Sequence, residues 1–233
     1  MNPVDRLIKK LRDDHPVFSI ILEDMKVEGS FFNKYYHRYK ILTGTGEDVD
    51  KTTTDWMEVR EGFFWEHERN LGMTLASRTK DGALHKEAAP PGFYNYVGDS
   101  QYGRFAQLNG QSFWVFFGQY MFLRSMLNLG DVDVFDDDYR KWKRNYRGRK
   151  PYYGSASGRY KSRYGTYSAY NRKSRPDFFE RRRRSSGWSK SQYTNTGDKR
   201  RSRGTFGRGV RRSNGRYSSG SGGFRSRGGG FGK

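Results

Sequence analysis

The residues of this chain best suited to chemistry are arginines and aromatic rings in its C-terminal half. A block of four arginines runs from Arg181 to Arg184. A guanidinium group forms paired hydrogen bonds to phosphate and stacks on planar rings, whereas a lysine ammonium acts mainly as a point charge. Aromatic rings at ordered sites stack on unpaired bases for about 1–3 kcal/mol each. We therefore expect the block to bind phosphates and five rings to stack on bases: Tyr152, Tyr153, Tyr160, Tyr164 and Trp188.

The last part of the chain alternates arginine, glycine and phenylalanine. Arg203, Arg208 and Arg227 each precede a glycine, and Arg227 begins an Arg-Gly-Gly triplet. Residues 201–233 resemble in composition the RGG/RG tails of RNA-binding proteins. The mixture of arginines and aromatic rings favours binding to RNA or single-stranded DNA with low sequence specificity, and these three arginines are further candidate contacts.

Charge and apolar content divide the chain at Tyr139. Residues 139–233 hold 29 Lys and Arg against three acids, and 21 of these cations are Arg. The whole chain carries a net charge of +20, so residues 1–138 are acidic. The basic part has no Leu, Ile or Met and only one Val, Val210. Ordering a residue costs about 1–2 kcal/mol, which so little aliphatic surface would not offset. The sequence predicts a disordered basic tail over 139–233.

Catalytic signatures are weak. The chain has no cysteine, which excludes disulfides, thiolate metal sites and cysteine nucleophiles. Its four histidines, His15, His37, His67 and His85, do not follow a metal-ligand spacing. The most suggestive stretch is Trp65-Glu66-His67-Glu68, and nothing sets its carboxylates apart from surface charges. We expect a non-enzymatic protein without cofactor or metal.

The elements that would position the tail lie in an α+β head over residues 1–130. Asn2-Pro3 is a typical helix start, and apolar residues at helical spacing predict a helix ending near Asp14. Residues 18–25 and 35–42 read as strands of a small antiparallel sheet. Residues 73–77 and 83–86 read as two more strands, joined by the hairpin signal Asp81-Gly82. For residues 56–65 the pattern fits a strand or a helix equally.

Residues 112–129 are the most hydrophobic stretch. Their apolar side chains cover nearly the whole helical wheel, so we expect a late hydrophobic helix surrounded by other groups. The sequence leaves three environments open: the core of the head, an interface with a protein partner or a second copy, and a membrane. Gln119 and Arg124 interrupt the run, which weakens the membrane alternative.

Residues 131–138 contain five aspartates and separate the head from the tail. They lack the glycine and glutamate of a calcium-binding loop. We expect an acidic hinge that is either solvated or pairs with the neighbouring tail.

Together these features favour a nucleic-acid-associated protein. Its tail would bind RNA or single-stranded DNA, and its head would dock to a protein partner or to itself. The alternative is a membrane-associated or assembly scaffold that uses 112–129 and lays its basic tail on anionic lipid. The charged start of the chain does not resemble a secretory signal, so we expect a cytoplasmic protein.

Overall fold

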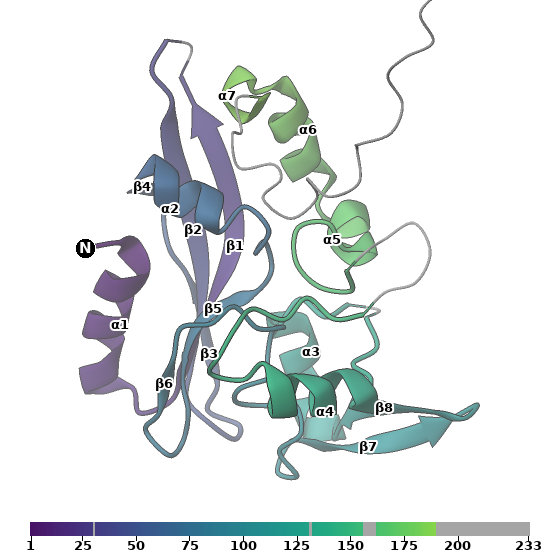
Figure 1. The fold of residues 1–233 in the computed structure, drawn as a ribbon. Helices are drawn as coiled ribbons and strands as arrows, with labels where there is room; N and C mark the ends of the chain where they lie inside the picture. The colour runs from purple at the N-terminus through teal and green to yellow at the C-terminus, as the bar shows by residue number, and fades with distance from the viewer. Residues whose placement is uncertain (30, 131, 156–161, 190–233) are drawn as a thin grey trace, which may run out of the picture. The chain divides into compact units, whose positions relative to one another are not determined.

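The computed structural model describes residues 1–29, 31–130, 132–155 and 162–189 (Figure 1). The first half of the described chain contains α1 (Pro3–Asp14), β1 (Phe18–Glu28), β2 (Lys34–Thr43), β3 (Asp50–Thr53), β4 (Met57–Val59), α2 (Glu61–Glu66), β5 (Thr74–Arg78) and β6 (Leu84–His85). The second half contains β7 (Gly103–Leu108), β8 (Gln111–Phe116), the 3-10 turn η1 (Gly118–Tyr120), α3 (Phe122–Met126), α4 (Asp136–Asn145), α5 (Ala169–Ser174), α6 (Pro176–Arg184) and α7 (Ser186–Ser189). The predicted α+β class, with an N-terminal helix and a small antiparallel sheet, is confirmed.

Helix α1 begins and ends where the sequence predicts. The side chain of Asn2 accepts a hydrogen bond of 2.8 Å from the backbone N–H of Asp5, and Pro3 occupies the first helical position. Val4, Ile8 and Leu11 form the buried face of the helix. These three side chains pack in the hydrophobic core on one face of the main sheet, so α1 covers that face.

The main sheet has the strand order β3–β2–β1–β5–β6, and β4 pairs with the part of β2 nearest its start. Strands β1 and β2 form a long antiparallel hairpin whose register runs from Phe18 opposite Thr43 to Glu28 opposite Lys34. The predicted Asp81-Gly82 hairpin is confirmed, because β5 and β6 pair across it and Gly82 has φ +82°. The undecided stretch 56–65 contains both alternatives, strand β4 followed by helix α2.

The predicted helix over 112–129 is wrong. Its first part is strand β8, which pairs with β7 through the two-residue turn Asn109-Gly110. Both turn residues have positive φ, +50° and +76°, as a tight β-hairpin turn requires. The rest is η1 and the short α3. None of the described helices has the length and hydrophobicity needed to span a membrane.

The predicted tail boundary at Tyr139 and the predicted acidic hinge are also wrong. Residues 136–145 form α4, which begins within the acidic run, and residues 162–189 pack on the head through α5, α6 and α7. Their aromatic rings supply the apolar surface that aliphatic residues would otherwise provide. The most deeply buried are Trp142, Tyr152, Tyr164, Phe178 and Trp188. The remaining predicted tail, 156–161 and 190–233, lies outside the described residues.

The core consists of two clusters, one on each face of the sheet. Consecutive β1 residues alternate between them, with Ile20 in the first and Ile21 in the second. The first cluster contains the buried face of α1, the rings of α2, and Phe178 and Trp188 from the C-terminal helices. The second contains Trp114 of β8 and Trp142 of α4. Helices α6 and α7 lie beside the part of β1 that extends past β5 (Figure 1).

Candidate nucleic-acid interface

The arginine block predicted to bind phosphates is divided by its ion pairs. The Arg181 guanidinium donates to both carboxylate oxygens of Asp24 on β1, each at 2.7 Å. Arg182 lies 2.8 Å from the carboxylate of Glu68 and donates to the hydroxyl of Tyr167. These two arginines therefore hold α6 on the head and have little freedom to bind another anion.

The other half of the block points outward. Arg183 and Arg184 are 74% and 78% exposed, and both pair with Glu180 one turn earlier, at 2.8 and 3.0 Å. Exposed pairs of this kind contribute little to stability and exchange readily with other ions. Arg183 and Arg184 remain candidate phosphate contacts. Their attraction for a phosphate is reduced because both pair with the carboxylate of Glu180.

The rings predicted to stack on bases are mostly core residues. Tyr152, Tyr164 and Trp188 are each at most 5% exposed, so the predicted stacking role of these three is wrong. Tyr153 is half-buried, donates from its hydroxyl to Asn70 at 2.7 Å and is covered by the guanidinium of Arg69. The other predicted contacts lie outside the described residues: Tyr160, Arg203, Arg208 and Arg227.

The buried tyrosines are held in two neighbouring segments, the first around Asp138 and the second around Asn171. The Tyr152 hydroxyl donates to Asp138 at 2.7 Å, and Arg163 lies 2.9 Å from the other oxygen of this carboxylate. Burial and the Asp138 carboxylate both raise the pKa of Tyr152, so its hydroxyl stays protonated. Asp138 is therefore used inside the fold, and it does not compete with outside anions as a free acidic hinge would.

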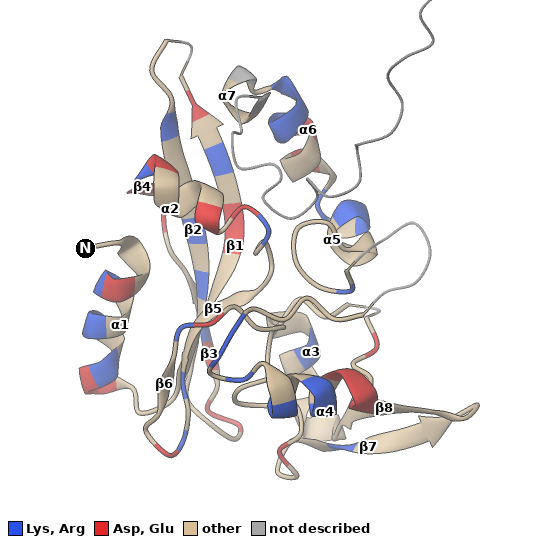
Figure 2. Ribbon diagram, viewed as in Figure 1, with Lys and Arg blue, Asp and Glu red and all other residues tan. Residues whose placement is uncertain are grey.

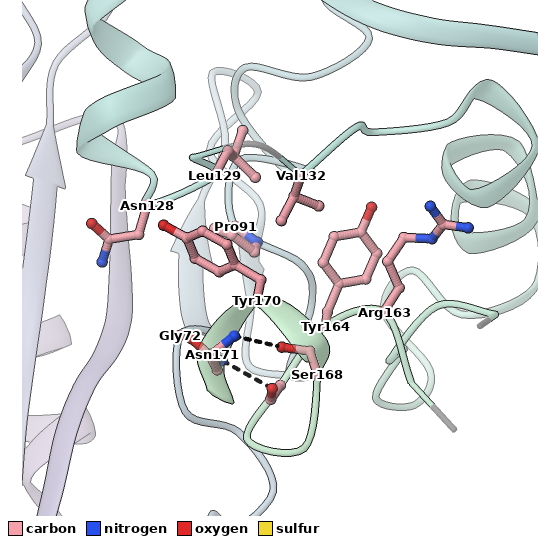
Figure 3. Close-up of a pocket in the computed structure, with 11 residues that line it drawn as sticks. Gly72, Pro91, Asn128, Leu129, Val132, Arg163, Tyr164, Ser168, Tyr170 and Asn171 are labelled. Carbon is pink, nitrogen blue, oxygen red and sulfur yellow. Dashed lines mark hydrogen bonds between the residues drawn. The ribbon is translucent and has the colours of Figure 1, made fainter. Parts of the chain in front are cut away.

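Figure 3 shows the second segment, where Tyr164 and Tyr170 lie near Leu129 and Val132. Asn171 anchors the turn before α5 by donating to the carbonyls of Leu71 and Gly165, each at 2.9 Å. The cavity between these groups has a volume of about 20 Å³, which holds one water molecule at most. It is a packing defect and offers no space for a small-molecule substrate.

Cations without acidic partners gather on α4 and the turn after it. We define the basic cluster as Lys143, Arg144, Arg147, Arg149 and Lys150. None of them forms an ion pair with a carboxylate in the described part of the chain, in contrast to the Arg181–Arg184 block. All are exposed except Arg147, which is half-buried.

The sequence of α4 explains why these cations are presented together. Three aspartates occupy its first turn, and Lys143 and Arg144 lie in its last turn, so the charges oppose the helix dipole at both ends (Figure 2). Trp142 is 1% exposed and fixes the inner face of the helix in the second core cluster. The cations consequently project from a fixed surface, which lowers the entropy lost when they bind an anion.

Aromatic rings lie directly beneath the basic cluster. The Lys150 ammonium is 4.8 Å from the ring centre of Tyr146, and the Lys143 ammonium is 6.0 Å from that of Tyr139. The Arg147 guanidinium lies 6.0 Å from the ring centre of Tyr94. Burial raises the pKa of Tyr94 to about 12, so this phenol is neutral at physiological pH. The surface thus combines positive charge with neutral rings, which suits contacts to both phosphates and bases.

In the stretch considered for catalysis, residues 65–68, the side chains of Trp65, His67 and Glu68 make structural contacts within the fold. Burial lowers the pKa of His67 to about 4, and its Nδ1 lies 2.8 Å from the side-chain nitrogen of Asn70. Glu68 pairs with Arg182, and Trp65 packs in the core. Among the described residues, no group of three His, Asp or Glu side chains is placed to hold a metal ion.

Comparison of this chain with protein-family models, curated proteins and solved structures gives no match. The interpretation of the site therefore rests on its chemistry. The sequence signal for the basic cluster was available in the change from Asp136–Asp138 to Lys143 and Arg144 around one tryptophan. Composition alone divides this helix between a predicted acidic hinge over 131–138 and a predicted disordered tail from Tyr139, which hides the signal.

Proposed function

We propose that the protein is a non-enzymatic nucleic-acid-binding protein whose affinity for RNA or single-stranded DNA depends on the basic cluster of α4. The observation that carries this proposal is the difference in ion pairing between two sets of cations. Arg181 and Arg182 are neutralised by Asp24 and Glu68, whereas the basic cluster has no described acidic partner. Cations of the second kind gain most from releasing counterions of a polyanion.

Low sequence specificity follows from the kind of groups presented. Phosphate contacts position a protein on nucleic acid and carry no sequence information, and stacking on tyrosine accepts every base. Residues 190–233 add twelve Lys and Arg against one Asp, and they would extend the same contacts along a bound strand. The head would supply any further contact to a protein partner or to a second copy, through groups such as the exposed Phe117 and Met121.

The test compares two triple variants of the full chain. One replaces Lys143, Arg144 and Lys150 by glutamine, and the control replaces Lys9, Lys10 and Arg12 on the exposed face of α1. Both lose two lysines and one arginine, so their net charge is the same. Binding to a short oligothymidylate is measured by fluorescence anisotropy over a series of salt concentrations.

We expect the α4 variant to weaken binding and to reduce the slope of log affinity against log salt by about 2, because three phosphate contacts are lost. The α1 variant should keep the wild-type slope. Equal loss in both variants would show that only net charge matters, and wild-type protein that fails to bind would refute the proposed function.

A further inference from the structure

The β1–β2 hairpin ends in two exposed phenylalanines. Phe31 and Phe32 are 94% and 89% exposed, whereas the next most exposed phenylalanine among the described residues, Phe117, is 41% exposed. Isolated apolar side chains are common on protein surfaces. Two adjacent rings with almost no contact to the rest of the chain leave a large apolar area in water, and they therefore indicate a contact with another molecule.

The paired strands place these two residues at the end of the hairpin. Strands β1 and β2 pair as far as Glu28 opposite Lys34, directly below the tip. Gly29 has φ +113°, and a Cβ at this position would lie 2.0 Å from the carbonyl oxygen of Phe32, so this position requires glycine. On the other side, Gly187 of α7 packs against Val27 and Asn33. The rings are thus presented by a supported hairpin.

A row of cations and rings continues from the tip along one face of the sheet. The Lys26 ammonium lies 4.5 Å from the ring centre of Trp56 and 5.1 Å from that of Tyr36. The Arg38 guanidinium lies 5.0 Å from the Trp56 ring on the same face. Lys26 pairs with the exposed Glu28 at 2.6 Å, and Arg38 lies 3.7 Å from Asp24, so both cations are partly compensated, as Arg183 and Arg184 are. Their side chains are still 22% and 37% exposed, and this accessible part is what a bound strand would meet. Tyr36 and Trp56 are both half-buried, so each keeps part of its ring accessible.

We propose that Phe31 and Phe32 stack on unpaired bases of a single-stranded nucleic acid whose backbone follows Lys26 and Arg38 along the sheet. This inference rests on the proposed function and adds a second contact surface, separate in sequence from the basic cluster. Unpaired bases offer the accessible ring faces that stacking needs, and the bases of a duplex are already stacked on one another.

The row below the tip favours a nucleic-acid strand over a lipid bilayer as the occupant. From Phe32 to Arg38 the chain advances six residues of nearly extended backbone, about 20 Å. An extended strand spans that distance and meets both the rings and the cations. A bilayer entered by the tip would leave Tyr36, Trp56 and Arg38 without a role, and the charged Glu28 and Lys34 directly below the tip oppose deep insertion.

The test uses the full chain with both phenylalanines changed to leucine, and a second variant with both changed to alanine. Leucine keeps apolar surface and loses the ring, so the pair separates stacking from general hydrophobic contact. Because both side chains are almost fully exposed, the thermal unfolding midpoint should stay at the wild-type value in each variant. The probes are a short oligothymidylate, a DNA duplex of the same length, and vesicles of phosphatidylcholine with phosphatidylserine.

We expect both variants to bind oligothymidylate about tenfold more weakly or worse, because each variant loses two rings that stack on bases. Duplex affinity, carried by phosphate contacts, should change less than twofold. Wild-type affinity of the leucine variant for oligothymidylate would overturn the proposal, as would an equal loss for single strand and duplex.

Vesicle binding that leucine preserves and alanine abolishes, with single-strand affinity unchanged, would assign the tip to a membrane and also overturn the proposal. The α4 triple variant distinguishes this inference from the proposed function. If that variant loses affinity while the Phe31 and Phe32 variants bind normally, the proposed function survives and only the hairpin contact is refuted.

Discussion

Arg181 and Asp24 are 157 residues apart in sequence, and the guanidinium of one donates to both carboxylate oxygens of the other at 2.7 Å. Arg38 also approaches Asp24, at 3.7 Å. The Asp24 side chain is 12% exposed, so its charge is balanced mainly by these two arginines. The pair joins the C-terminal helices to the central strand of the sheet.

Replacing Asp24 by asparagine should therefore undock α6 in part. We expect a loss of about 1–3 kcal/mol in the free energy of unfolding, because a charged hydrogen bond is removed and Arg181 stays partly buried without its partner. The same change frees a guanidinium, so affinity for oligothymidylate should rise slightly. Urea unfolding and anisotropy measure the two effects. Glu180→Gln, which removes the exposed partner of Arg183 and Arg184, is the control and should change stability by less than about 0.5 kcal/mol.

Trp188 should be one of the most sensitive positions near the end of the described chain. Its ring is 5% exposed and contacts Phe64, Trp65 and Phe178 at centroid distances of 5.0, 6.2 and 5.5 Å. Trp188→Ala should destabilise the protein by about 3–5 kcal/mol in urea unfolding. An effect below about 1 kcal/mol would show that α7 does not contribute to the core. Phe32→Ala removes an equally aromatic but exposed side chain and should have no such effect.

Two truncated chains test where the folded unit ends. A chain of residues 1–189 retains every described element and should unfold at nearly the same temperature as the whole protein. A chain of residues 1–138 lacks Trp142, Tyr152, Tyr164 and Phe178, all of which are buried. We expect it to lose cooperative thermal unfolding and to expose apolar surface that binds a hydrophobic dye. Normal cooperative unfolding of the shorter chain would restore the boundary predicted from composition.

The buried histidines should make stability depend on pH. Burial lowers the pKa of His37, and it lowers that of His67 from 6.5 to about 4. Between these values the unfolded chain binds more protons than the folded one, so stability falls as pH decreases from 6.5 toward 4. His67→Gln should remove up to about 3 kcal/mol of this dependence, measured by urea unfolding across that range. His15→Gln, at the end of α1, is the control. If the two variants show the same pH profile, His67 does not carry the effect.

Local signals in the sequence predicted the elements that local chemistry controls. The cap at Asn2, the proline at the first helical position and the Asp81-Gly82 turn define α1 and the β5–β6 hairpin. The Asn109-Gly110 pair carried the same kind of signal for β7 and β8. It was outweighed by the aromatic run that follows, because a helix and a strand covered on both faces have similar hydrophobic patterns.

The tail prediction is wrong for the described residues between 139 and 189, for a different reason. Its lack of Leu, Ile and Met suggested that it had no means of burial, yet large rings from Trp142 to Trp188 bury as much surface as aliphatic side chains. Their apolar partners lie in the head, on α2 and beneath α4, so no calculation on the tail alone would reveal them. The candidate site differs from its prediction for the same reason. The ion pairs that form in the folded chain decide which arginines can still bind a phosphate, and these pairs cannot be read from the tail alone.

The position of Trp188 against α2 also has a consequence for synthesis of the chain. Domains form from the N-terminus as they emerge from the ribosome. Here Phe64 and Trp65 pack against Trp188, which is translated more than 120 residues later. The sheet of the nascent protein therefore stays uncovered along part of β1 until almost all of the described polypeptide has been made, and this interval is when aggregation or chaperone capture would compete with folding.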